Sequence, residues 1–126
     1  MLTKELQYIS ELTVDEEVTA LTMGSGDLPV LATPALVALM ENSAMKAVAP
    51  ELDNTQTTVG AQIEVKHLKP SRIGATIKSK AVLVNIDGKK LSFQIEATDN
   101  GILIATASHI RFIVDRKRFM ERLEEK

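Results

Sequence analysis

The residue that most suggests chemistry is Glu41, because it lies in the middle of an otherwise nearly apolar stretch, residues 33–50. Thr33 is suited to cap a helix, and Pro34 to occupy the first helical position, where its missing N–H costs nothing. Pro50 limits continuation, because the residue before a proline is pushed out of the α region. We therefore predict one buried helix of about four turns. A buried carboxylate such as Glu41 needs an interaction partner or has a catalytic role.

His67 is the second candidate, because it lies near the end of a predicted strand, residues 58–68. One face of that strand is formed by apolar residues at alternate positions: Val59, Ala61, Ile63 and Val65. His67 continues this row, so the alternation directs it toward the helix. A histidine beside a shielded carboxylate is a usual way to build a general base or an activated nucleophile. We therefore expect Glu41 and His67 to border one cleft, within one subunit or across a dimer.

Each of these residues also has a purely structural interpretation. A single histidine at a strand end is more often a hydrogen-bonded structural residue than a catalyst. Glu41 lies one helical step, about 100°, from the side of Asn42 and Lys46, so it could border a solvated strip. Thr33 is expected to cap the helix whatever else it does. The set is therefore more informative than any one member.

The remaining elements are mostly strands. We predict them at about 5–12 and 16–22 before the helix, and at 58–68, 75–86, 91–98 and 102–114 after it. Asp87-Gly88 and Asn100-Gly101 are two-residue hairpin signals, and the last four strands are predicted to form an antiparallel meander. Asp115 can cap a short charged helix. The economical arrangement is an α+β fold, in which an antiparallel sheet wraps around one long central helix and a second subunit closes the side left open.

Composition limits the class of protein. The 126 residues fit one domain, which we expect to span 1–126. The chain has no cysteine, which excludes disulfides, thiolate metal sites and a cysteine nucleophile, and which fits the cytoplasm. The polar N-terminus is unlike a signal peptide, and the longest apolar run, 35–49, is too short to span a membrane. A net charge of −2, with one tyrosine and three phenylalanines, argues against a nucleic-acid partner.

The chain resembles the hotdog-fold acyl-CoA thioesterases, and the fluoroacetyl-CoA thioesterase family in particular. The resemblance covers about residues 28–119 and rests on the joint spacing of several short segments. They are Ala32-Thr33, Leu39-Met40-Glu41, Met45 to Pro50, Val59-Gly60, Val65-Lys66-His67, Gly88-Lys89-Lys90-Leu91-Ser92 and His109-Ile110-Arg111, followed by Phe119.

The resemblance implies that Thr33, Glu41 and His67 are the catalytic residues of a hydrolase that acts on an acyl-CoA. Glu41 would attack the thioester carbonyl or activate a water molecule, and His67 would be the general base or acid. Thr33 would hydrogen-bond Glu41 or the substrate. Gly60 would let the backbone approach the acyl group, and Arg111 would lie near the acyl or carboxylate end, unless it is only an ion-paired strand residue. The resemblance also implies a homodimer, or a tetramer.

No metal or cofactor is expected, because a thiolate leaves readily, and two histidines without an acidic cluster make a poor metal site. Coenzyme A would enter only as part of the substrate. The basic run 116–118 could meet its phosphates, or could simply begin a solvated helix.

One departure from the family concerns the substrate. The fluoroacetyl-specific enzyme carries phenylalanines in a lid before the helix, whereas this chain has Gly-Ser-Gly-Asp at residues 24–27. We therefore expect a short or medium acyl-CoA rather than fluoroacetyl-CoA. Two other functions stay open. One is a hotdog dimer that binds an acyl-CoA or a small acid without turnover. The other is an acyl-thioester dehydratase, although the glycine-rich segment expected before its helix is missing.

Overall fold

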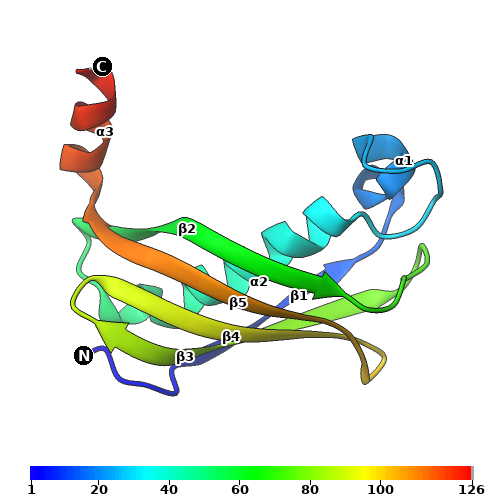
Figure 1. The fold of residues 1–126 in the computed structure, drawn as a ribbon, viewed down its shortest axis with the longest axis horizontal. Coiled ribbons are helices and arrows are strands. Elements are labelled where there is room, and N and C mark those ends of the chain that lie inside the picture. The colour runs from blue at the N-terminus through cyan, green and yellow to red at the C-terminus, as the bar shows by residue number, and fades with distance from the viewer. Residues whose placement is uncertain (126) are drawn as a thin grey trace.

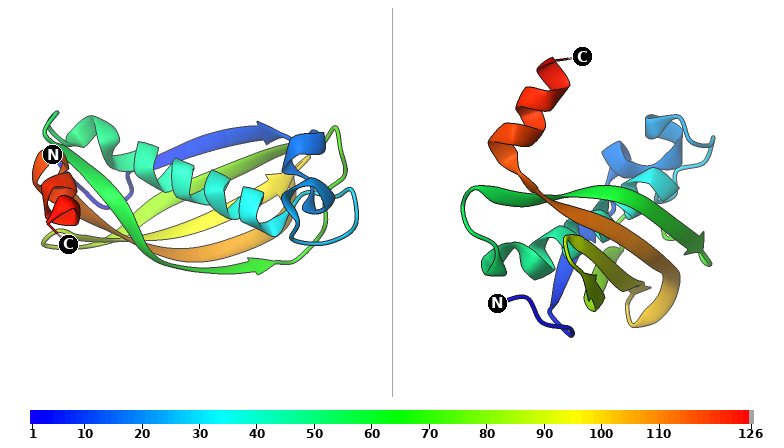
Figure 2. Two further views of the ribbon diagram at one scale, coloured as in Figure 1. Left: turned by 90° about the horizontal axis from the view of Figure 1, so that it is seen from above. Right: turned by 60° about the vertical axis from the view of Figure 1, so that its left-hand side comes forward.

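The computed structural model describes residues 1–125 and shows one curled antiparallel sheet that holds a long helix on its inner face (Figure 1). The strands are β1 (Gln7–Thr13), β2 (Gln56–His67), β3 (Thr76–Asp87), β4 (Lys90–Asp99) and β5 (Ile102–Asp115). The helices are α1 (Ala20–Met23), α2 (Thr33–Val48) and α3 (Arg116–Glu124), with 3₁₀ turns at Glu16–Val18 and Ala49–Glu51. The left view of Figure 2, from above, shows α2 running along the strands, and the right view shows α3 standing away from the sheet.

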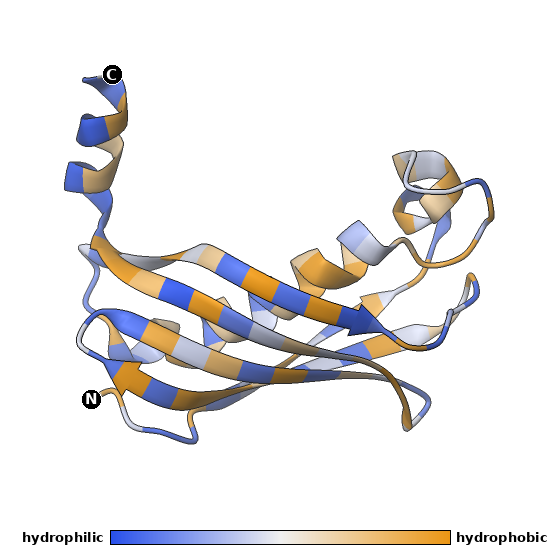
Figure 3. Cartoon of the chain, viewed as in Figure 1, coloured by the Kyte–Doolittle hydropathy of each residue, from blue (hydrophilic) through white to orange (hydrophobic). Residues whose placement is uncertain are grey.

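The hydrophobic core lies between α2 and the sheet. Leu36, Met40, Ala44 and Val48 recur every fourth residue of α2 and are fully buried. Apolar and polar residues alternate along the strands, as the colours in Figure 3 show, and β3, β4 and β5 turn mainly apolar faces to the helix. The predicted α+β fold, with its antiparallel sheet around one central helix, is confirmed. Among residues 1–125, no helix is both long and apolar enough to cross a membrane.

The start of α2 differs from the prediction by one residue. Ala32 is the N-cap and makes no side-chain capping bond, while Thr33 is already helical. The capping role predicted for Thr33 is therefore wrong, because its hydroxyl instead contacts His67. The end is as predicted, since α2 stops at Val48 and Pro50 lies in the 3₁₀ turn that follows.

The strand predicted at residues 16–22 does not form. This segment is a 3₁₀ turn followed by the short helix α1. The Asp15 carboxylate accepts from the N–H of Glu17 at 2.9 Å, and the Thr19 hydroxyl accepts from the N–H of Thr22 at 3.3 Å. Such side-chain bonds to the local backbone compete with a strand ladder, and alternation alone did not reveal them.

The four-strand meander is also wrong, although the sheet is antiparallel as predicted. The strand order is β1-β3-β4-β5-β2, so only the last three strands form a meander. Because β3 already pairs with β1 and β4, the free edge left for β2 is that of β5. Residues 68–75 make the crossing connection, which an isolated bridge between Val30 and Arg72 ties to the segment before α2.

Both predicted hairpins form, one at the predicted residues and the other shifted by one residue. Asn100 and Gly101 join β4 to β5 with φ values of 50° and 81°, the positive values that a type I′ turn needs at both central positions. The β3–β4 turn consists of Gly88 and Lys89, one residue later than predicted. Asp115 caps α3 as predicted, because its carboxylate accepts from the N–H of Arg118 at 2.9 Å.

Leu36 provides a test of the core. Leu36→Ala removes a fully buried side chain, so we expect it to lower the free energy of unfolding by about 2–5 kcal/mol. The matched control is Leu21→Ala, where the side chain is 56% exposed and the expected change is within about 0.5 kcal/mol. Urea unfolding followed by circular dichroism measures both. Equal losses in the two variants would contradict the described core.

Candidate active site

A β-bulge in β2 decides which of its side chains face α2. Gly60 pairs with Arg111 and Gln62 pairs with Ile110, so Ala61 has no partner across the ladder. One extra residue reverses the alternation of the strand. Residues on the helix side are therefore even-numbered before the bulge and odd-numbered after it.

The predicted inward row is therefore only partly right. Ile63, Val65 and His67 do share the inward face, because each opposes a buried residue of β5. Val59 and Ala61 do not continue that row. Their places on the helix side are taken by Thr58, which is buried, and Gly60, which opposes the buried Arg111.

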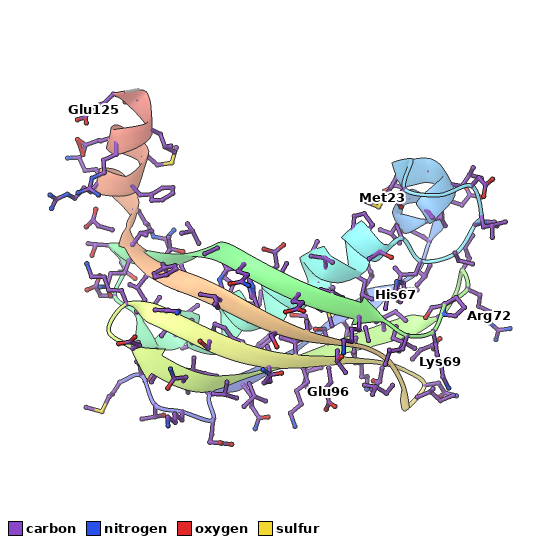
Figure 4. The ribbon with its side chains drawn as sticks, viewed as in Figure 1. Met23, His67, Lys69, Arg72, Glu96 and Glu125 are labelled. Carbon is purple, nitrogen blue, oxygen red and sulfur yellow. The ribbon has the colours of Figure 1, made fainter. Side chains whose placement is uncertain are left out.

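Thr33 and His67 form one pair of candidate residues. Figure 4 shows His67 at the end of β2, beside the start of α2. The Thr33 hydroxyl and His67 Nδ1 are 2.8 Å apart. His67 Nε2 is shielded from solvent and has no hydrogen-bond partner within residues 1–125. Burial lowers the pKa of His67, so the ring is neutral near pH 7 and Nε2 can accept or pass on a proton.

This pair lines a hollow of about 340 Å³ between the α1 segment and the end of β2. Ala20, Leu31 and Leu68 make part of its wall apolar. A larger hollow of about 730 Å³ lies beside the β4–β5 turn, but its lining includes neither histidine. We therefore place the candidate site at the smaller hollow.

Glu41 belongs to a second group, in the gap between α2 and the β2–β5 edge. Its Oε2 is 4.0 Å from Nη1 of Arg111. A Cβ added at Gly60 would lie only 2.9 Å from the same oxygen, so glycine leaves the room that this carboxylate occupies. The predicted burial of Glu41 is wrong within one chain, because its side chain is 41% exposed. The reason is that α2 packs mainly on β1 and β3, so its side toward β2 is largely uncovered.

Arg111 is the buried cation of this group. Its Nε donates to the Thr58 hydroxyl at 2.8 Å and its Nη2 to the Thr58 carbonyl at 3.0 Å. Nη1 lies 3.1 Å from Nε2 of His109. Burial lowers the pKa of Arg111 and the nearby Glu41 opposes the change. The guanidinium stays charged at neutral pH and points at the carboxylate.

His109 and Thr58 were not predicted as site residues. A signal existed for His109, because it lies two positions before Arg111 in one strand and therefore on the same face. Thr58 precedes the predicted inward row by one residue, so strict alternation directs it outward. The signal that could have corrected this is Gly60, because a glycine inside a strand often marks a bulge.

The two groups lie apart within one chain. Thr33 and Glu41 are eight residues apart on α2, which is about 12 Å along the helix axis. Within residues 1–125, neither a hydrogen bond nor an ion pair joins Glu41 to Thr33 or His67. The structure thus brings Thr33 to His67, and Glu41 to Gly60 and Arg111, without joining the two groups.

The wrapped sheet and its central helix define a hotdog-fold protein, with polar groups set between the helix and one sheet edge. The chain belongs to the fluoroacetyl-CoA-specific thioesterase family, because the sequence profile of that family matches residues 14–117. Among its relatives is the fluoroacetyl-CoA thioesterase of Streptantibioticus cattleyicolor. The two are 30% identical over 97 residues, which cover 77% of this chain and 70% of that enzyme.

Solved structures show the same fold. A structure of the fluoroacetyl-CoA thioesterase FlK matches with a TM-score of 0.92 and 24% identity, over 100% of this chain and 98% of that one. A hot-dog-like protein from Thermanaerovibrio acidaminovorans matches with a TM-score of 0.89 and 18% identity, over 98% and 92% of the two chains. At these identities the likeness establishes the fold alone.

The buried histidines predict a pH dependence. Burial lowers the pKa of both His67 and His109 from the ordinary value of 6.5. The unfolded chain then binds protons more readily than the folded one, so the two groups make the free energy of unfolding fall as pH drops from about 6.5 toward the folded pKa values. We expect proton NMR to show both rings titrating below 6.5, while urea-unfolded protein titrates near it. Titration of either ring at or above 6.5 in the folded protein would contradict the described burial.

Proposed function

We propose that the protein hydrolyses acyl-CoA thioesters with a short or medium acyl chain, giving the free acid and coenzyme A. The observation that carries this proposal is the family match over residues 14–117. The geometry supports it, because a neutral imidazole and a carboxylate beside a fixed cation both lie along α2.

The proposed chemistry follows from these positions. Hydrolysis of a thioester builds negative charge on the carbonyl oxygen, which fixed donors stabilise. The first turn of α2 supplies free N–H groups and the positive end of the helix dipole beside Thr33. Glu41 attacks the carbonyl carbon or takes a proton from the water that does. The neutral His67 ring takes up the proton that the attacking water gives up and passes it to the departing thiolate, so that coenzyme A leaves as a thiol. If Glu41 attacks directly, the thiolate leaves first and water then hydrolyses the acyl-glutamate anhydride. The proton that His67 takes from this water then neutralises the thiolate.

Neither a metal nor a separate cofactor is part of this proposal, because a thiolate is a comparatively good leaving group. Coenzyme A takes part as the leaving half of the substrate. We also propose a cytoplasmic location, which the cysteine-free composition supports.

The segment above the hollow supports a substrate other than fluoroacetyl-CoA. The side chains that make the wall of the hollow apolar include the aliphatic ones of Val30, Leu31 and Leu68, and no aromatic residue occurs between Tyr8 and Phe93. An aliphatic wall accepts a short or medium hydrocarbon chain by burial of apolar area. It lacks the ring edges and faces with which aromatic residues would contact a small acyl group.

We propose a homodimer that covers the open side of α2. Val37 and Ala38 lie on that side, and the outer edge of β2 pairs with no strand of residues 1–125. In a two-fold dimer each contact occurs twice. Two α2 helices packed antiparallel about Val37 and Ala38 would bring Thr33 of one chain opposite Glu41 of the partner subunit. This arrangement would unite the two groups that lie apart in one chain.

Two single substitutions test the proposed chemistry. We expect Glu41→Ala and His67→Ala each to lower thiol release by roughly 10²–10⁴-fold, because each removes a group that moves a proton or attacks in the transition state. A panel of acyl-CoAs from two to ten carbons provides the assay, and circular dichroism checks folding. The matched control is Glu96→Ala, which removes an exposed carboxylate on the outer side of β4 (Figure 4). Full activity in both variants would overturn the assigned roles.

The same panel separates hydrolysis from binding without turnover. A non-catalytic acyl-CoA-binding protein would be stabilised by the ligand in a thermal shift assay, because binding to the folded state raises its stability. It would release no thiol. That result would replace the hydrolase proposal with the binding one.

Mixing inactive variants tests the dimer. In a site shared by two chains, a mixed dimer of Glu41→Ala and His67→Ala retains one site with both groups intact. We therefore expect thiol release to return when the two variants are unfolded together and refolded. Light scattering should give a mass of twice 13.8 kDa for the native protein. A monomer mass, or a mixture as inactive as its components, would contradict the shared site.

A further inference from the structure

His109 is a buried histidine for which the proposed chemistry has no role. It lies on β5 with only 2% of its surface exposed, and its ring is 6.2 Å from that of Phe93. Both ring nitrogens have partners. Nδ1 is 2.7 Å from the carbonyl oxygen of Gln62, and Nε2 is 3.1 Å from Nη1 of Arg111.

These partners determine where the proton of His109 lies. The Gln62 carbonyl can only accept, so Nδ1 must carry the hydrogen. The Arg111 guanidinium can only donate, so Nε2 must offer its lone pair. Both bonds form together only in the neutral tautomer with hydrogen on Nδ1. Burial, and then the charge of Arg111, lower the pKa of His109, while the Gln62 carbonyl and the Glu41 charge oppose them.

The bonds form a continuous path from the bulge to the carboxylate. Gln62 follows the unpaired residue of the bulge, and its carbonyl holds the His109 ring. His109 accepts from Nη1, the same nitrogen that lies 4.0 Å from Glu41 Oε2. Thr58 holds the other side of the Arg111 guanidinium through Nε and Nη2. Of these hydrogen bonds, the one from Nη1 to His109 is the one that holds Nη1 beside the Glu41 carboxylate. Without the imidazole this bond is lost.

We infer that His109 is a positioning residue, whose Nε2 accepts a hydrogen bond from Arg111 and thereby keeps the guanidinium directed at Glu41. The effect of His109 on the reaction rate rests on the proposed thioester hydrolysis. The effect of His109 on the position of the Arg111 side chain does not depend on that proposal. A guanidinium held in one place orients the carboxylate without reorganising during the reaction.

Three substitutions at one position separate the acceptor from the rest of the ring. His109→Gln can place an amide oxygen near the position of Nε2 and so retain the acceptor. His109→Asn can retain the donor to the Gln62 carbonyl but does not reach Arg111. His109→Phe retains the ring and its packing but neither hydrogen bond. Ser108→Ala is the neighbouring control, because the Ser108 side chain is exposed and its hydroxyl makes a side-chain hydrogen bond only with Gln94 among residues 1–125.

Two measurements are made on each variant. The first is steady-state thiol release, and the second is the signal of the Arg111 Nη–H protons, the group that donates to His109, in a proton–nitrogen NMR spectrum. We expect the Asn and Phe variants to lose on the order of 10- to 100-fold in kcat with KM nearly unchanged, since a hydrogen bond to a charged group is lost. In both variants the Arg111 signal should broaden or disappear. The Gln variant should keep the signal and most of kcat, and Ser108→Ala should match the native protein.

Two results would overturn the inference. In one, the Asn and Phe variants keep both kcat and a sharp Arg111 signal. In the other, kcat follows thermal stability across the three variants and the Gln variant recovers nothing, which is the behaviour of a packing residue. Absence of thiol release by the native protein would instead overturn the proposed function, and the Arg111 signal alone would then decide the positioning role.

Discussion

The unpaired residue Ala61 sets the direction of the polar side chains on the inner face of β2. Gly60 and His67 are seven positions apart, so a regular strand would turn them to opposite faces. The bulge brings both to the helix side, where Gly60 leaves room for Glu41 and His67 meets Thr33. A site between one helix and one strand therefore depends on a single irregularity in the ladder.

A second constraint is the burial of charge. Arg111 is 6% exposed, and an isolated buried cation is costly. Thr58 and His109 offset this cost with hydrogen bonds, and Glu41 supplies an opposite charge that is itself half exposed. This asymmetry suits a reaction, because the held cation stays in place while the carboxylate remains accessible to a substrate.

The spacing of apolar residues predicted the long helix and five of the strands. Each of these elements buries one side, so its apolar residues recur at the period of that element. It failed at residues 16–22, where side chains bond the local backbone. Strand partners were missed because pairing is decided by which edges are free, and local patterns do not encode this. The bulge at Ala61 was missed, because apolar residues continue at alternate positions through it, and the interior glycine beside it, Gly60, was not read as its sign. Thr33, Gly60 and Arg111 were named through family resemblance, whereas Glu41 and His67 already stood out by residue type and place.

A crystal structure with a thioether analogue of an acyl-CoA, which cannot be hydrolysed, would show directly whether Glu41 and His67 border one substrate. We predict a two-fold dimer in which the carbon that replaces the thioester carbonyl lies about 3–3.5 Å from a Glu41 oxygen, the separation of a near-attack arrangement. The analogue's sulfur should face a His67 ring. An analogue bound with its reacting atoms remote from both side chains would contradict the account.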